Sequence, residues 1–231
     1  MKNILEVKNL TKKYKDGDIE VTALDNVTFK LQEGNDLSIL GPSGSGKTTL
    51  LQLAGGLDFM TDGTVLIDGL DIKKMNDQQI SDFRNRTMGF IFQMINLHSF
   101  LTAKENIMVP MLILNTPKRE AEEKADRLLD KMGMLQRANH LPSQLSGGEQ
   151  QRIAVARALA NDPKIIFADE PTGKLDKKNS ALIIELLENL SKDKGMSVIM
   201  ITHDENIAKR FSRIIKLENG SIKKDINLYD N

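Results

Sequence analysis

Apolar runs that alternate with helix-like segments dominate the last third of the chain. Residues 164–168, 197–201 and 213–217 are rich in apolar residues, and segments 178–193 and 204–211 between them have the pattern of helices. An apolar run without polar alternation is typical of a strand buried on both faces, as in a parallel sheet. The pattern therefore predicts βα units and an α/β fold with a mostly parallel sheet covered by helices.

The first third of the chain has a different pattern. Residues 3–34 contain short strand-like stretches with turn signals at Asp16-Gly17 and Glu33-Gly34, and residues 64–67 form another such stretch before a further Asp-Gly turn. Strand-like stretches bounded by turn residues predict a small antiparallel β region beside the parallel sheet.

The middle of the chain, from about residue 94 to 160, has a helical pattern. Pro117 suits the start of a helix and Gly133 its end, and the apolar positions between them fall on one helix face, at Ala121, Ala125, Leu128, Leu129 and Met132. Ser146 has Glu149 three residues later, which is the spacing of a capping box at the start of another helix.

These patterns divide one domain, residues 1–231, into two parts. We expect residues 1–93 and 161–231 to form the core with its β region, and residues 94–160 to form an inserted helical subdomain. Three methionines of the insertion leave two interpretations open: they line a surface groove, where a flexible thioether adapts to a partner, or they fill the core. They are Met94, Met108 and Met111.

One loop has the chemistry of a phosphate site. It fits G-x-x-x-x-G-K-[ST], and with the next threonine it consists of Gly41, Pro42, Ser43, Gly44, Ser45, Gly46, Lys47, Thr48 and Thr49. Glycines let backbone N–H groups surround phosphate oxygens, and the following helix adds its positive end. We expect Lys47 to reach the outer phosphates and the Thr48 hydroxyl to ligate Mg²⁺. A strand-like run before the loop and a helix-like run after it disfavour a chance turn.

A pair of carboxylates follows the apolar run at residues 165–168. Asp169 is then at the carboxyl end of a buried strand, where ligands of open α/β sheets bind, and it is expected to hold Mg²⁺. Glu170 is expected to polarise the water that attacks the outer phosphate. The alternative is an ordinary acidic loop, which the phosphate loop upstream disfavours.

A second Gly-rich turn, Leu-Ser-Gly-Gly-Glu-Gln, stands at residues 145–150. With it, the chain resembles the ATP-binding subunit of ABC transporters over roughly residues 3–224. The family's motifs occur here in the expected order, at residues 41–48, Gln93, residues 145–150, residues 165–170, Asp176 and His203. The resemblance implies a P-loop NTPase core, ATP and Mg²⁺ as ligands, and ATP hydrolysis.

The resemblance also implies roles for single residues. Tyr14 matches the aromatic residue that stacks on adenine, and Gln93 the residue that contacts Mg²⁺ or water and senses the membrane partner. Glu170 matches the general base, and His203 the residue that contacts the γ-phosphate. Without the resemblance, the sequence favours Tyr14 as a half-exposed strand residue and His203 as a structural residue at a strand end.

Other roles concern a second copy of the chain. Ser146, Gly147 and Gly148 match the residues that bind the γ-phosphate held by the opposite subunit, and Asp176 matches the aspartate that couples the subunits. The turn at 145–150 has an alternative interpretation as a helix cap alone. The chain departs from the family pattern at Asn35-Asp36 and at Lys174, where asparagine or alanine is common.

The resemblance implies partners and a place in the cell. It predicts a homodimer in the ATP-bound state and an integral membrane permease subunit as partner, with the chain at the cytoplasmic face of the cell membrane as a peripheral protein. Residues 55–58, 92–97, 101–106 and 168–173 resemble the lipoprotein-releasing, macrolide- or peptide-exporting, bacitracin-resistance and cell-division group. An exporter or peptide-resistance system is favoured. The alternative is a cell-division-type ATPase that regulates a membrane protein without transport.

Composition narrows the other possibilities. The 231 residues include 32 basic and 32 acidic residues, so the net charge of zero argues against a nucleic-acid-binding surface. The absence of cysteine fits a reducing compartment. No apolar run reaches the roughly 18 residues of a membrane span, and no signal peptide is visible, so a membrane role requires a partner. A soluble repair or translation ATPase is disfavoured. A P-loop kinase is disfavoured as well, because the turn at residues 145–150 has no role in such an enzyme.

Overall fold

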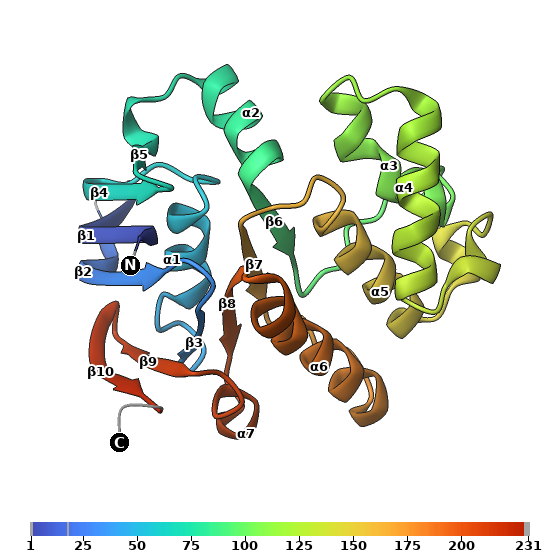
Figure 1. The fold of residues 1–231 in the computed structure, drawn as a ribbon. Coiled ribbons are helices and arrows are strands. Elements are labelled where there is room, and N and C mark those ends of the chain that lie inside the picture. The colour runs from blue at the N-terminus through green and yellow to red at the C-terminus, as the bar shows by residue number, and fades with distance from the viewer. Residues whose placement is uncertain (1, 18, 229–231) are drawn as a thin grey trace.

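Two β-sheets form the framework of the chain in a computed structural model, which describes residues 2–17 and 19–228 (Figure 1). The larger sheet has six strands in the order β10-β9-β3-β8-β7-β6. These are β3 (Asp36–Leu40), β6 (Met88–Ile91), β7 (Ile165–Asp169), β8 (Ser197–Thr202), β9 (Arg213–Glu218) and β10 (Ser221–Asn227). All neighbours pair in parallel except β10 and β9, which confirms a mostly parallel sheet.

The smaller sheet is antiparallel and has the order β2-β1-β4-β5. Its strands are β1 (Asn3–Asp16), β2 (Ile19–Gln32), β4 (Asp62–Ile67) and β5 (Leu70–Asp71). The expectation of short strands in the first third was wrong, because β1 and β2 each run for 14 residues. Register shifts between Val7 and Lys13 interrupt their pairing, and these irregularities made one long hairpin resemble several short strands.

Seven α-helices cover the two sheets in the described part of the chain. They are α1 (Lys47–Ala54), α2 (Asp77–Thr87), α3 (Ala103–Ile113), α4 (Lys118–Lys131), α5 (Gly147–Ala158), α6 (Lys177–Lys194) and α7 (Glu205–Ala208). Figure 1 shows α1 beside both sheets, whereas α3, α4 and α5 gather on the opposite side of the molecule. Leu50, Leu51 and Leu53 of α1 share one core cluster with strands of both sheets.

A second core lies under α3, α4, α5 and α6. It contains the expected apolar face of α4, with Ala121, Ala125 and Leu129 fully buried. Met108 and Met111 belong to this core, so for them the core interpretation is correct, whereas Met94 is 64% exposed. Buried apolar area of this kind is the main driving force that holds the helices against the sheet.

Several local expectations were wrong. Residues 94–102 form an irregular segment rather than a helix, and α7 ends at Ala208 rather than near residue 211. The sequence analysis did not predict α2, β6 or β10. Helix α2 is mostly polar, but Asn76 and Gln79 form a capping box at its start, and that spacing was an available signal.

A buried amide fixes the segment that follows Gln93. Asn106 of α3 is fully buried, and its side-chain nitrogen donates to the carbonyl oxygens of His98 and Leu101, at 3.1 and 2.9 Å. Its side-chain oxygen accepts from the backbone N–H of His98 at 2.8 Å. In a helix over residues 94–102, backbone N–H and C=O groups would pair with one another. Here the Asn106 side chain pairs with backbone groups of His98 and Leu101, so tertiary contacts replace the expected helix.

Candidate nucleotide site

The phosphate loop connects β3 to α1 and contains the start of that helix. Gly46 has φ of +97°, and a Cβ there would lie 2.5 Å from the carbonyl oxygen of Ala23, so only glycine fits. The N-cap residue of α1 is Gly46, which has no side chain to cap the helix. The Ser45 hydroxyl is buried without a partner among the described residues. Free N–H groups at a helix start, with an unpaired hydroxyl beside them, fit a phosphate group.

Lys47 lies within this loop and is almost fully buried. Its ammonium donates to the carbonyl oxygen of Pro42 at 2.7 Å. Burial lowers its pKa, and the nearby carboxylates of Glu170 and Asp169 oppose that shift. A buried cation of this kind is stabilised further by an anion, and the loop N–H groups are arranged to hold one.

Thr48 and Asp169 place two oxygen ligands side by side. The Thr48 hydroxyl lies 3.4 Å from a carboxylate oxygen of Asp169. Burial raises the pKa of Asp169, and the Glu170 charge adds to the shift, whereas the Thr48 hydrogen bond and the Lys47 charge oppose it. A carboxylate that loses hydration on burial gains from a nearby cation, and Mg²⁺ prefers oxygen ligands, so these residues fit the expected metal.

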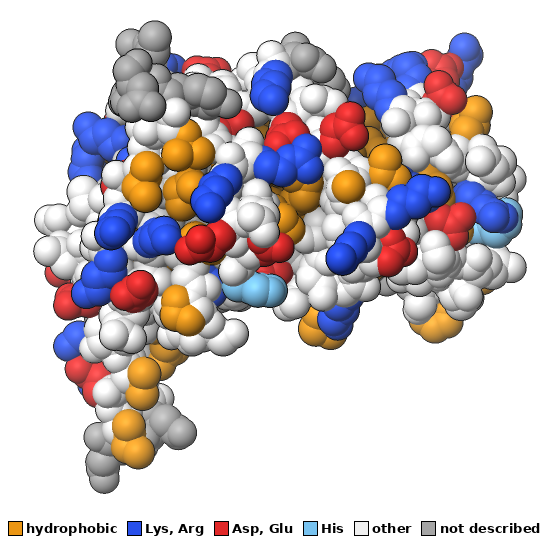
Figure 2. All heavy atoms as spheres, turned by 90° about the horizontal axis from the view of Figure 1, so that it is seen from below, with side chains coloured by type: hydrophobic (Ala, Val, Ile, Leu, Met, Phe, Trp, Pro, Cys, Tyr) orange, Lys and Arg blue, Asp and Glu red, His pale blue; other side chains and the backbone are white. Residues whose placement is uncertain are grey.

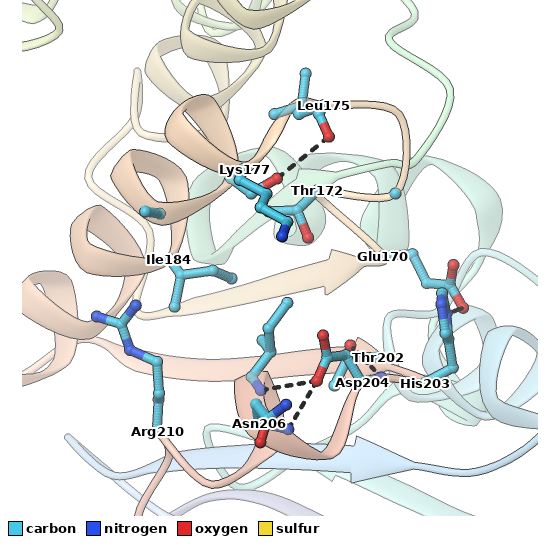
Figure 3. Close-up of a pocket in the computed structure, with 14 residues that line it drawn as sticks. Glu170, Thr172, Leu175, Lys177, Ile184, Thr202, His203, Asp204, Asn206 and Arg210 are labelled. Atoms are coloured by element: carbon cyan, nitrogen blue, oxygen red, sulfur yellow. Dashed lines mark hydrogen bonds and ion pairs between the residues drawn. The ribbon is translucent and has the colours of Figure 1, made fainter.

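Glu170 is held by two side chains at the end of β7. Its backbone has φ of +42°, which is unusual for a residue with a side chain. One carboxylate oxygen lies 3.3 Å from the side-chain nitrogen of Gln93, and the other lies 3.1 Å from Nδ1 of His203. Figure 3 shows Glu170 and His203 at one end of a pocket of about 520 Å³. The two contacts fix the direction in which the carboxylate points.

Tyr14 lies on the strand pair that contacts the phosphate loop. It pairs with Val21 of β2, two residues before Ala23, whose carbonyl packs against the loop. Its hydroxyl donates to Asp58 at 3.1 Å, and the Lys12 ammonium lies 4.7 Å from the ring centroid. No local pattern predicts the contact with Asp58, which lies 44 residues away in the chain.

The second Gly-rich turn stands at the start of α5, among the helices. The Ser146 hydroxyl accepts from the N–H of Glu149 at 3.3 Å, while a carboxylate oxygen of Glu149 accepts from the Ser146 N–H at 2.8 Å. The predicted capping box is therefore present. Asp176 caps α6 by accepting from the N–H of Asn179 at 2.8 Å. Lys174, near Asp176, is exposed, and no ion pair joins it to the rest of the described chain.

The expected site residues thus form two groups. One group surrounds the phosphate loop and the ends of β7 and β8, and it contains Lys47, Thr48, Gln93, Asp169, Glu170 and His203. The other group stands at the starts of α5 and α6, and it contains Ser146, Gly147, Gly148 and Asp176.

Asp169→Asn is expected to raise the free energy of unfolding of the nucleotide-free protein at about pH 8. The gain is on the order of 1 kcal/mol, since the variant removes a charge whose burial is unfavourable. The folded protein holds the Asp169 proton more tightly than the unfolded chain does. The cost of the charge therefore grows as pH rises through the raised pKa and is absent at low pH.

Urea unfolding at about pH 8 and about pH 4 measures this difference, which is expected to shrink at the lower pH. Asp130→Asn is the matched control, because Asp130 is exposed on α4. A parent protein more stable than Asp169→Asn at the higher pH would contradict the unfavourable burial of this carboxylate.

Comparison with known proteins identifies the family of the chain. The family model described as ABC transporter matches residues 24–173. The lipoprotein-releasing system ATP-binding protein LolD of Syntrophus aciditrophicus is 45% identical over 220 residues, which cover 95% of this chain and 98% of that protein.

Two solved structures share the fold. The dimeric post-hydrolysis structure of the ATP-binding cassette MJ0796 of Methanocaldococcus jannaschii, bound to ADP and Pi, has a TM-score of 0.91 at 41% identity and covers 98% of this chain and 100% of that chain. The structure of cbiO1 from Clostridium perfringens, part of the ABC transporter complex cbiONQ, has a TM-score of 0.87 at 27% identity, covering 99% of this chain and 90% of that chain. The chain therefore belongs to the ABC transporter family, as an ATP-binding subunit with the ATPase fold.

Proposed function

We propose that two copies of this chain bind two ATP molecules between them and use hydrolysis to drive a membrane partner. The arrangement of Glu170 carries the proposal: its carboxylate stands next to Lys47 and Asp169 and is held from both sides by Gln93 and His203. Such a carboxylate can orient a water toward the outer phosphate and accept its proton.

The other residues of this group bind and orient the nucleotide. The phosphate loop and Lys47 hold the phosphates and stabilise negative charge that develops on them. Tyr14 offers its ring to adenine, and His203 approaches the γ-phosphate beside Glu170. Mg²⁺, held by Thr48 and Asp169 with Gln93 nearby, would neutralise charge on the phosphate oxygens.

The second group of residues supports a shared nucleotide. Pro42, Ser43 and Gly44 are exposed, and so are Ser146 and Gly147, with open space around the position of a Gly147 Cβ. In Figure 1 these two loops lie on different parts of the chain. The start of α5 is suited to an anion by its free N–H groups and its dipole. We propose that it meets the γ-phosphate held by a second copy, so that ATP stabilises the closed dimer.

A groove next to Gln93 supports a protein partner. It has a volume of about 350 Å³ and is lined by Phe90, Phe92, Val109 and Ile113 among others. Phe92 directly precedes Gln93, and the Gln93 side chain contacts Glu170. A partner segment bound in the groove would therefore be linked to Glu170 through Gln93 alone. We propose that the membrane subunit docks here and that the chain works at the membrane surface. No helix in the described ranges has the length and apolar character of a membrane span.

The branch of the family is proposed from the relatives. The similarity to LolD favours a lipoprotein- or peptide-exporting system, and a regulator of the cell-division type is the alternative. Figure 2 shows acidic and basic side chains interspersed on the face seen from below, with hydrophobic side chains in small groups. That mixture supports a protein partner over nucleic acid, which favours a continuous basic surface.

Glu170→Gln is expected to lower ATP hydrolysis at least about a hundredfold and to accumulate an ATP-bound dimer, because glutamine keeps the size of the side chain but cannot accept the proton. Phosphate release and light scattering on a sizing column, with ATP or ADP, measure both effects. Glu185→Gln, on the exposed face of α6, is the matched control. Hydrolysis at the parent rate would refute the role as a base, and a monomer in saturating ATP would refute the shared nucleotide.

Tagged Glu170→Gln protein, purified in ATP from membranes of its own host, is expected to retain a protein with several membrane spans. Mass spectrometry identifies it, and its architecture separates an exporter from a division regulator. Adding Ile113→Glu, in the groove, should release the partner, whereas Leu70→Glu, at a similarly exposed position on β5, should not. Recovery of soluble proteins alone would contradict the membrane partner.

A further inference from the structure

Asn179 of α6 connects the start of α6 to the start of α5. Its side-chain nitrogen donates to a carboxylate oxygen of Asp176 at 2.7 Å, in addition to the backbone bond that caps the helix. Its side-chain oxygen accepts from the guanidinium of Arg152 on α5 at 3.3 Å. The Asn179 amide therefore bonds to Asp176 at the start of α6 and to Arg152 of α5. The proposed function places the starts of both helices against the second copy.

Gly148 packs directly against this amide. A Cβ at Gly148 would lie 2.5 to 2.8 Å from the three terminal atoms of the Asn179 side chain, closer than any side chain allows. The first turn of α5 is thus seated on Asn179. This contact gives Gly148 a reason to be glycine that is independent of any ligand.

We propose that Asn179 is a positioning residue. It holds the Gly-rich turn at the start of α5 and the turn that contains Asp176, at the start of α6, as one unit. The inference rests on the proposed function, in which this unit meets the nucleotide held by the second copy. The amide is suited to the place, because it offers a donor to the Asp176 carboxylate and an acceptor to the Arg152 guanidinium. Aspartate would supply only acceptors, and leucine would supply neither.

The variant Asn179→Asp tests the polarity of this connection. It removes the amide donor and puts a second carboxylate beside Asp176, where like charges repel. In a Glu170→Gln background with ATP, we expect dimer affinity to fall about tenfold. Binding of ADP to the monomer, which uses the phosphate loop, is expected to stay unchanged.

Asn179→Leu and Glu185→Gln complete the series. The leucine variant is expected to weaken the dimer, since its side chain offers neither donor nor acceptor. The glutamine variant, on the exposed face of α6, is expected to behave like the parent. Equal dimer affinity for all variants would overturn the proposal.

A measurement on the monomer separates this proposal from the proposed function. If Asn179 seats the first turn of α5, Asn179→Leu should increase hydrogen exchange of the bonded amides at residues 149–152 at least severalfold without any nucleotide. Unchanged exchange there would overturn the positioning role even if ATP-dependent dimers form. Failure of the Glu170→Gln parent to form dimers, with increased exchange in the leucine variant, would refute the shared nucleotide and leave the positioning role supported.

Discussion

The unsatisfied N–H groups at the start of α1 are the constraint on which the site depends. A helix start without a cap is stable only where water or an anion meets its donors. Here Gly46 turns the chain sharply, Ser45 keeps a buried hydroxyl without a partner among the described residues, and Lys47 is buried with its ammonium on a carbonyl oxygen. The loop is thus organised around a negative charge that the protein itself does not supply.

The sheet topology brings the reacting groups to that charge. The phosphate loop follows β3, Glu170 follows β7 and His203 follows β8, and these three strands are parallel neighbours in the order β3-β8-β7. Their carboxyl ends therefore meet at one edge of the sheet, where ligands of open α/β sheets bind. Gln93 follows β6, the next strand along, so the residue after Phe92 of the groove reaches Glu170.

The sequence predicted features that depend on local chemistry. The phosphate loop, the buried strands around residues 165–168 and 197–201, and the Ser146 capping box follow from short patterns, and the structure contains each of them. It did not predict the irregular segment at residues 94–102, which the buried Asn106 amide holds, or the contact of Tyr14 with Asp58. Asn179 has the N-cap spacing from Asp176, but its bond to Arg152 depends on how two helices pack. Pairings between distant segments leave little trace in local pattern.

The central claim is that one ATP touches the phosphate loop of one copy and the Gly-rich turn of another. The chain has no cysteine, so single cysteines report on this directly. Two Glu170→Gln chains, one with Ser43→Cys and one with Gly147→Cys, are mixed and treated with a short bis-maleimide reagent. We expect the mixed pair to cross-link in ATP and not in ADP. Equal cross-linking in both nucleotides, or none with ATP bound, would contradict the shared site.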